Sequence, residues 1–137
     1  TREYYINDEG NQIEKLVDFI GWIKESDIPN YLSISKLGLS PLHKNIHHDT
    51  TYANKVFQYI SFGCPIVSSN VIAQSELVNK YKIGVIFKDN NAFDLSEKII
   101  ELHNDKNLYN RLKQNCLDSI EKLNNSVISN QLISIYE

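Results

Sequence analysis

Short runs of apolar residues alternate along this chain with longer segments in which apolar residues recur every three or four positions. A short apolar run without alternation is typical of a strand that is covered on both faces. Such runs predict four strands, over residues 16–21, 37–42, 65–69 and 83–87. The first run is closed by Gly21, and the third changes from apolar residues to serines at its end.

The spacing of apolar residues and the end signals between these runs predict helices. Ser26 or Asp27 can cap a helix that has Pro29 in its first turn. Further helices are predicted over residues 55–62, 73–81, 92–104, 108–123 and 126–137. Residues 1–15 are ambiguous, and a helix is favoured in their second half.

Strands that alternate with helices are typical of a parallel sheet with helices on both faces. We therefore expect a three-layer α/β/α fold, in a single domain that covers residues 1–137, since the sequence shows no repeat, low-complexity tract or linker. Right-handed crossovers place the strand-to-helix loops on one edge of the sheet, where ligands of such sheets bind. Four loops then form the candidate site, at residues 21–24, 43–54, 68–72 and 88–91.

The densest polar segment covers residues 43–55, between the second strand and the helix that follows it. The N-terminus of that helix presents free backbone N–H groups and a partial positive charge, which favour a phosphate. Lys55 lies in the first turn, where a cation opposes the helix dipole. A bound anion would resolve that conflict, and the alternative is an exposed lysine on a helix surface.

Composition excludes several classes of protein. The chain has no apolar run near the roughly 20 residues that a membrane span requires, and it has no signal-peptide pattern. Its net charge of −3 disfavours non-specific binding of nucleic acid. Cys64 and Cys116 cannot build a disulfide scaffold, and we interpret them as reduced thiols of a cytosolic protein. Because the chain has no methionine, we expect a processed N-terminus or a part of a longer chain.

The segment NKVFQYISFGCPIVSS, residues 54–69, carries a resemblance to a known family. It resembles the "nK-x-x-E-Y-x-x-x-G-x-P-V" stretch in the donor-binding, C-terminal domain of retaining glycosyltransferases with the GT-B fold, and family 4 is the nearest group. Further landmarks match in order, at residues 17–22, 34–42, 76–78 and 83–86. The resemblance implies a Rossmann-like domain, half of a GT-B fold, that lacks its opening strand-helix units.

The resemblance also implies roles for residues around the "nK" helix. Lys55 would contact the diphosphate of a nucleotide sugar, and the loop before it, with His48, Thr50 and Thr51, would meet the sugar and the diphosphate. Gln58 stands where the family has a glutamate that binds the ribose, and Thr50 stands where it often has a glutamate that contacts the sugar. A glutamine still hydrogen-bonds hydroxyl groups, although without charge.

The loop after the first predicted strand completes the implied site. Gly21, Trp22 and Ile23 match the place where the family holds the base, largely through backbone groups; for Trp22 the alternative is a plain packing residue. The implied reaction transfers a sugar from a UDP- or GDP-linked donor with retention at the anomeric carbon. Fixed cations and backbone N–H groups stabilise the leaving diphosphate, so we expect no metal and no other cofactor. No catalytic residue is identified.

A metal site is the competing interpretation of the polar segment. His43, His47, His48 and Asp49 are ligand types, but they lie in one loop without a cysteine or a fourth fixed ligand, which does not favour a metal. A contact from His47 or His48 to the donor is favoured instead.

The resemblance further implies partners and a setting for the full-length protein. The acceptor, a carbohydrate or a lipid-linked sugar of bacterial envelope polysaccharide or glycolipid synthesis, would bind through a missing N-terminal domain, in the cytoplasm at the inner face of the membrane. The chain alone would then be inactive. Because Gln58 and Thr50 replace acids, a non-catalytic scaffold or partner-binding domain of the same fold is the alternative.

Overall fold

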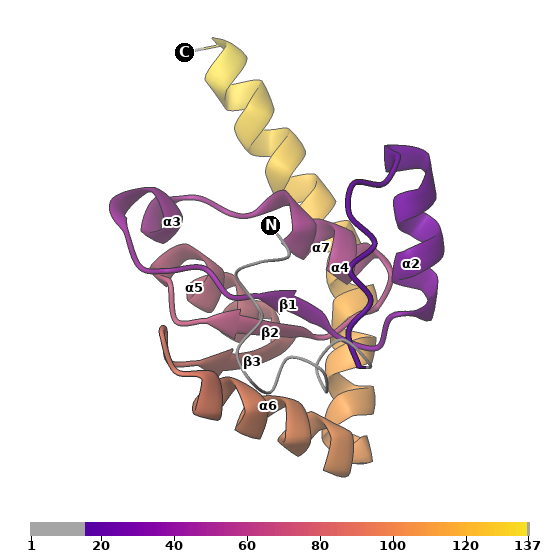
Figure 1. Cartoon of the computed structure of the whole chain (residues 1–137). Coiled ribbons are helices and arrows are strands. Elements are labelled where there is room, and N and C mark those ends of the chain that lie inside the picture. The colour runs from indigo at the N-terminus through magenta and orange to yellow at the C-terminus, as the bar shows by residue number, and fades with distance from the viewer. Residues whose placement is uncertain (1–15, 137) are drawn as a thin grey trace.

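A computed structural model describes residues 16–136, with side chains up to residue 123. Its centre is a sheet of three parallel strands, β1 (Gly38–Ser40), β2 (Ile66–Ser69) and β3 (Gly84–Phe87), in the order β1-β2-β3 (Figure 1). Leu39 of β1 is in register with Val67 of β2, which is in register with Val85 of β3. The predicted parallel sheet is confirmed.

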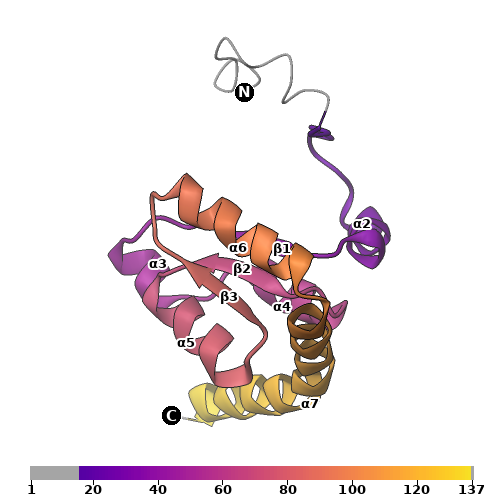
Figure 2. The same cartoon turned by 90° about the horizontal axis from the view of Figure 1, so that it is seen from below.

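Helices cover both faces of this sheet. Along the chain they are the short 3-10 helix η2 (Glu25–Asp27), α2 (Ile28–Ile34), α3 (Ile46–Thr50), α4 (Asn54–Ser61), α5 (Ile72–Tyr81), α6 (Ala92–Asn104) and α7 (Lys106–Tyr136). Figure 2 shows α6 alone in front of one face, with α4 and α5 behind the other. Helix α7 runs along the edge of these layers, so the predicted three-layer, Rossmann-like arrangement is confirmed.

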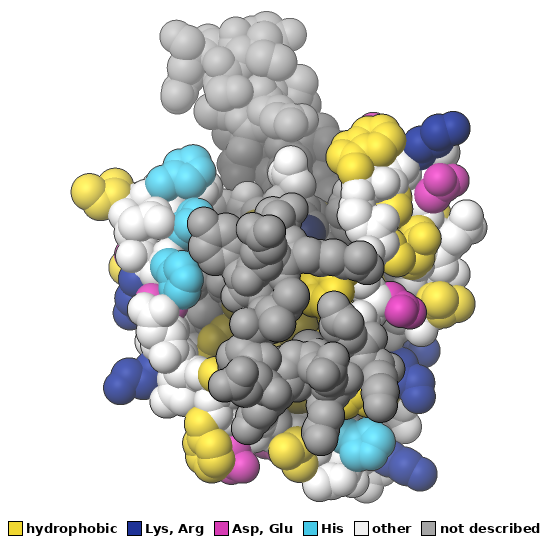
Figure 3. Space-filling model, in the orientation of Figure 1, with side chains coloured by type: hydrophobic (Ala, Val, Ile, Leu, Met, Phe, Trp, Pro, Cys, Tyr) yellow, Lys and Arg dark blue, Asp and Glu magenta, His cyan; other side chains and the backbone are white. Residues whose placement is uncertain are grey.

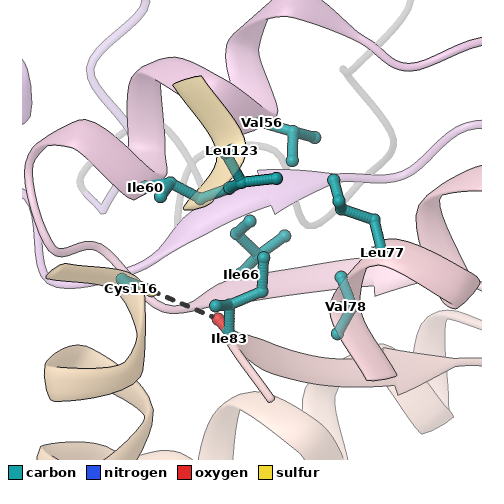
Figure 4. Close-up of a cluster of buried hydrophobic side chains, with 8 residues drawn as sticks. All are labelled: Val56, Ile60, Ile66, Leu77, Val78, Ile83, Cys116 and Leu123. Carbon is teal, nitrogen blue, oxygen red and sulfur yellow. Dashed lines mark hydrogen bonds between the residues drawn. The ribbon is translucent and has the colours of Figure 1, made fainter. Parts of the chain in front are cut away.

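The sheet separates two hydrophobic clusters. The first lies under α4, α5 and α7 and contains Val56, Ile60, Ile66, Leu77, Val78, Ile83, Cys116 and Leu123 (Figure 4). The second lies under α6 and contains Val67, Phe87, Leu102 and Leu112. Consecutive residues of β2, Ile66 and Val67, therefore enter opposite clusters, and the unalternating apolar run of this strand follows from its burial on both faces.

Gly63 ends α4 as the sequence predicts. Its φ of 65° lies in the left-handed region, which costs glycine little. The N–H of Gly63 donates to the carbonyl of Ile60, and the N–H of Cys64 donates to that of Tyr59, which is a Schellman motif. The chain thereby reverses from α4 directly into β2.

The prediction of a strand over residues 16–21 is wrong. The structure has no strand there, and all six residues are exposed. Side-chain hydrophobicity alone does not make a strand, because the backbone must also pair with a neighbour and the side chains must be covered. The remaining strand predictions are confirmed, although β1 is shorter than its run and covers Gly38–Ser40.

One loop prediction and one helix prediction need correction as well. Residues 43–54 are not all loop, because α3 forms within them, started by the Asn45 side chain, whose Oδ1 accepts the N–H of His48 at 2.8 Å. The helices predicted over 108–123 and 126–137 are one helix, α7. The asparagines between them lower helix propensity only slightly, and neither a glycine nor a proline interrupts the segment. The prediction for residues 1–15 lies outside the described residues.

Candidate functional site

Three of the four predicted loops meet at the carboxyl ends of the strands. Asp89, two residues after β3, accepts the backbone N–H of Lys44 at 3.0 Å and lies 3.0 Å from Nδ1 of His43. Its own N–H donates to Oδ1 of Asn70, which follows β2, at 2.9 Å. These hydrogen bonds join the loops after β1, β2 and β3 into one surface.

Asp89 is held in its ionised form by these contacts. The N–H of Lys44 and the His43 side chain lower the pKa of the Asp89 carboxyl below its ordinary value. Hydrogen bonds to a carboxylate favour its charged form. The centre of the joined loops therefore carries a fixed negative charge that is shared between two donors.

Helix α3 is anchored to the neighbouring loop by another carboxylate. Asp49 accepts the backbone N–H of Ile72, the first residue of α5, at 2.9 Å. Helix α5 has no side-chain cap from its own N-cap residue, Val71, and the distant Asp49 supplies one of its missing acceptors. The polar segment is thus attached to the sheet edge at Asp49 and at His43.

Lys55 is the second residue of α4 and is half-buried. The N-cap, Ala53, has no side-chain acceptor, and no acidic residue lies in the first turn. Burial lowers the pKa of the Lys55 ammonium group, because desolvation disfavours its charge. Among the described residues Lys55 has no ion pair. Gln58 lies one turn later on the same side of α4 and is exposed.

The other predicted site residues before α4 bond within the polar segment. The hydroxyl groups of Thr50 and Thr51 donate to carbonyls of α3, at 2.8 Å to Ile46 and 2.7 Å to His47 respectively. Nδ1 of His48 lies 2.7 Å from the carbonyl oxygen of His43 and 2.9 Å from Nδ2 of Asn45, so it is engaged within the polar segment in either tautomer. Nε2 of His48 and the lone pairs of both threonines remain for other partners.

The loop at residues 21–23 does not lie with the other loops. In Figures 1 and 2 the indigo segment before α2 lies toward the opposite end of the sheet from α3. Trp22 is 87% exposed, and Ile23 is partly buried. Gly21 has a φ of 69°, a conformation that favours glycine. Among the predicted site residues, His48, Thr50 and Thr51 lie in or directly after α3, Lys55 and Gln58 lie in α4, and residues 21–23 lie apart from α3 (Figures 1 and 2).

Histidine side chains gather on one side of the molecule beside α3 (Figure 3). This patch contains His43, His47 and His48, and the rings of the last two lie 5.7 Å apart, centroid to centroid. Within the part of the chain that the structure describes, no group of three His, Cys, Asp or Glu is placed to hold a metal ion.

Several polar residues of this edge were not singled out by sequence reasoning. Asn70 and Asp89 lie in predicted loops, but only the fold shows that they bridge them. Gln74 of α5 is fully buried, and its Oε1 accepts hydrogen bonds from Ser40 and Ser68 at 2.7 and 3.2 Å. Its position on an otherwise apolar helix face was the available signal, because a buried amide requires partners.

The structure also has a cavity of about 480 Å³ at the other edge of the sheet. Its walls are Val78, Asn79, Lys82, Gly84, Arg111 and Leu112. Gly84 is the first residue of β3, so this cavity lies away from the carboxyl ends and from the joined loops. Among the described helices, none is long and apolar enough to cross a membrane.

Comparisons with known proteins agree with this architecture. The family model described as "Glycosyl transferases group 1" matches residues 7–117. A solved structure, the C-terminal domain of the glycosyl transferase group 1 family protein LpcC from Francisella tularensis, is similar with a TM-score of 0.67 and 18% identity. The similarity covers 84% of this chain and 60% of the solved chain, and at this identity it shows the fold. No curated protein matches.

Proposed function

Because the chain belongs to the glycosyl transferases group 1 family, we propose that it is the donor-binding domain of a glycosyltransferase. One observation carries the proposal. Lys55 lies half-buried at the uncapped N-terminus of α4, without an ion pair among the described residues. A cation beside the positive end of a helix is unfavourable in the empty protein and suits the two phosphates of a nucleotide sugar.

The proposed roles follow from positions around this helix. Lys55 contacts the diphosphate, and Gln58, one turn later and exposed, hydrogen-bonds the ribose. Thr50 and Thr51 offer acceptor lone pairs to the sugar, because their hydroxyl protons already bond carbonyls of α3, and His48 offers its Nε2.

The proposed reaction is transfer of the sugar with retention, from a UDP- or GDP-linked donor. Lys55 and the free N–H groups of α4 stabilise the charge that develops on the leaving diphosphate, and a metal is not required for that. The acceptor is a carbohydrate or lipid-linked sugar of envelope polysaccharide or glycolipid synthesis. A separate domain holds it, on the cytoplasmic side of a membrane.

Isothermal titration with UDP, GDP and ADP tests the proposal. We expect UDP or GDP to bind, and Lys55→Ala to weaken that binding about tenfold or more, as for the loss of a charge-assisted hydrogen bond. Lys80→Ala is the matched control, because Lys80 is an exposed lysine in the last turn of α5. Folded protein that binds none of the three nucleotides contradicts a donor site.

A non-catalytic scaffold of the same fold is the second candidate. The observation that favours it is the pair Thr50 and Gln58, which offer no carboxylate to the sugar and the ribose. Gln58→Glu distinguishes the two candidates. A donor domain gains affinity for the nucleotide from the stronger acceptor, whereas a scaffold shows no nucleotide binding in either form.

A further inference from the structure

The cavity between α5 and α7 is large enough for a small molecule. Its volume of about 480 Å³ lies within the range of about 300–1,000 Å³ that is typical of small-molecule sites. Val78 of α5 and Leu112 of α7 form the apolar part of its wall, and they are 1% and 5% exposed. The cavity adjoins Gly84 at the start of β3, whereas the proposed donor site lies at the carboxyl ends of the strands. A ligand of this cavity is therefore distinct from the nucleotide sugar.

Lys82 and Arg111 give this cavity a positive charge. Both side chains are exposed and line it, and its described walls contain no aspartate or glutamate. Neither cation has an ion pair among the described residues. The acidic residues nearest to them on α5 and α7 are Glu76 and Asp118, six and seven positions away along the chain. No carboxylate of the described residues therefore neutralises the two cations.

A hydrogen bond between α7 and the end of α5 brings the two cations to the same place. Nδ2 of Asn115 donates to the carbonyl oxygen of Lys82 at 2.8 Å, and the N–H of Lys82 donates to the carbonyl oxygen of Val78. Arg111 lies four residues before Asn115, one turn away on the same face of α7. The backbone of Lys82 is thus fixed on both sides, next to the helix face that carries Arg111.

The helix dipole explains only one of these cations. Lys82 follows the last residue of α5, where a cation is favourable without any ligand. Arg111 is the sixth residue of α7, which begins at Lys106, so it lies beyond the first turn in which the dipole acts. Two like charges at one cavity repel each other in the empty protein, and an anion between them removes that repulsion.

We propose that this cavity binds a small organic phosphate monoester. The phosphoryl group lies between Lys82 and Arg111, and the organic part lies against Val78 and Leu112. The planar guanidinium group of Arg111 pairs with two phosphoryl oxygens, and the ammonium group of Lys82 adds a second charge. A phosphate monoester carries about two negative charges at pH 7, so it matches two cations better than a single carboxylate does. This second site goes beyond the proposed function and does not depend on the donor site.

Phenyl phosphate is the probe, with inorganic phosphate and phenol as its two halves. Titration of the 137-residue chain, followed through the backbone NMR resonances of Gly84 and Leu112, reports binding at the cavity. We expect phenyl phosphate to bind with a Kd on the order of 1 mM, and each half to bind about tenfold more weakly. Resonances that do not move at about 10 mM phenyl phosphate overturn the inference, as does phenol that binds as tightly as phenyl phosphate.

Two variants remove the positive charges one at a time. Arg111→Gln and Lys82→Asn should each weaken the binding of phenyl phosphate about tenfold. Asparagine suits position 82, because the φ of 51° there lies in the left-handed region. Lys113→Gln and Lys80→Gln are the matched controls, since these exposed lysines lie two residues away and outside the cavity walls. If the controls weaken binding as much as the two variants do, the probe responds only to net charge and the inference is wrong.

Nucleotide binding separates this second site from the donor site. Arg111→Gln should bind UDP or GDP with the affinity of the wild type while it loses phenyl phosphate. If both Arg111→Gln and Lys82→Asn keep the wild-type affinity for phenyl phosphate, the probe binds elsewhere, and the inference is wrong while the proposed function stands. If the folded wild type binds phenyl phosphate at the cavity but no nucleotide, the proposed function is overturned and the second site stands.

Discussion

The carboxylate of Asp49 in α3 caps helix α5 by accepting the backbone N–H of Ile72 at 2.9 Å. The two residues are 23 positions apart, and α5 has no side-chain cap of its own. A single hydrogen bond thus attaches the polar segment to the first turn of the helix after β2. The carboxylate also lies at the positive end of that helix, where an anion is favourable.

We expect Asp49→Ala to lower the free energy of unfolding by about 1 kcal/mol, the typical cost of a lost N-cap. Asp49→Asn keeps an acceptor and should cost less. Urea denaturation measures both. Asp118→Ala is the control, since Asp118 is exposed on α7 and, among the described residues, its side chain bonds only that of Gln114. Equal effects of Asp49→Ala and Asp118→Ala would show that the cap contributes nothing.

Replacement of Lys55 should instead raise the free energy of unfolding. Lys55→Gln removes a half-buried charge from the first turn of α4, so it should raise the free energy of unfolding by about 0.5 kcal/mol while it weakens nucleotide binding. Burial lowers the pKa of Lys55, so the gain should shrink as pH rises through that lowered pKa, where the wild-type lysine also becomes neutral.

Lys80→Gln is the comparison for this stability measurement. Lys80 lies in the last turn of α5, where a cation complements the dipole, so its loss should lower stability slightly. Urea unfolding at neutral pH, followed by nucleotide titration of the same samples, measures both effects. A Lys55→Gln protein that is less stable than the wild type contradicts an electrostatic conflict at this helix end.

The sequence predicted the elements that local rules specify. β2 is an apolar run buried on both faces, Gly63 is the left-handed stop of α4, and Asn91 caps α6 by accepting the N–H of Asp94. The two helix ends depend on hydrogen bonds between residues close in sequence, and the strand is indicated by its apolar run. The parallel sheet then followed from their alternation.

Local rules could not predict which residues join the loops of the candidate site. Asp49, Asn70 and Asp89 each bond a residue 19 or more positions away, so their partners are known only once the strands are placed. The prediction of a strand over the exposed segment 16–21 was wrong for a related reason. Its apolar pattern equals that of a buried strand, and only the tertiary fold shows whether a neighbour pairs with it.

Gly84 offers a test of the close approach between β2 and β3. A Cβ atom at this position would overlap the carbonyl oxygen of Ile66, which is backbone and cannot move aside without breaking the strand pairing. We expect Gly84→Ala to lower the free energy of unfolding by more than about 2 kcal/mol, or to prevent folding. Circular dichroism and urea denaturation measure the loss.

Gly38→Ala is the comparison for this test. An added Cβ at Gly38 would meet the ring of Tyr59, which packs against the first hydrophobic cluster; because a side chain can shift without breaking the strand pairing, the loss should be smaller. If Gly84→Ala is as stable as the wild type, β2 and β3 do not approach as closely as the register of Ile66 with Gly84 requires.

The thiol of Cys116 should make the fold sensitive to alkaline pH. Cys116 is fully buried in the first hydrophobic cluster, and its Sγ donates to the carbonyl oxygens of Ile83 and Cys64 at 3.5 and 3.7 Å (Figure 4). Burial, with a smaller contribution from nearby Cys64, raises the pKa of this thiol to about 12. The folded state then keeps a proton that the unfolded state loses near pH 9.

Stability is therefore complete below pH 9 and falls as pH rises toward 12, with a limiting slope of about 1.4 kcal/mol per pH unit from this group. Urea unfolding at pH 8 and pH 10 measures the fall. Cys116→Ala lowers stability at pH 8, because it leaves a small cavity, but it should lose less between the two values. A Cys116→Ala protein with the same alkaline decline as the wild type would assign that decline to other groups, of which Cys64 and Tyr59 also have raised pKa values.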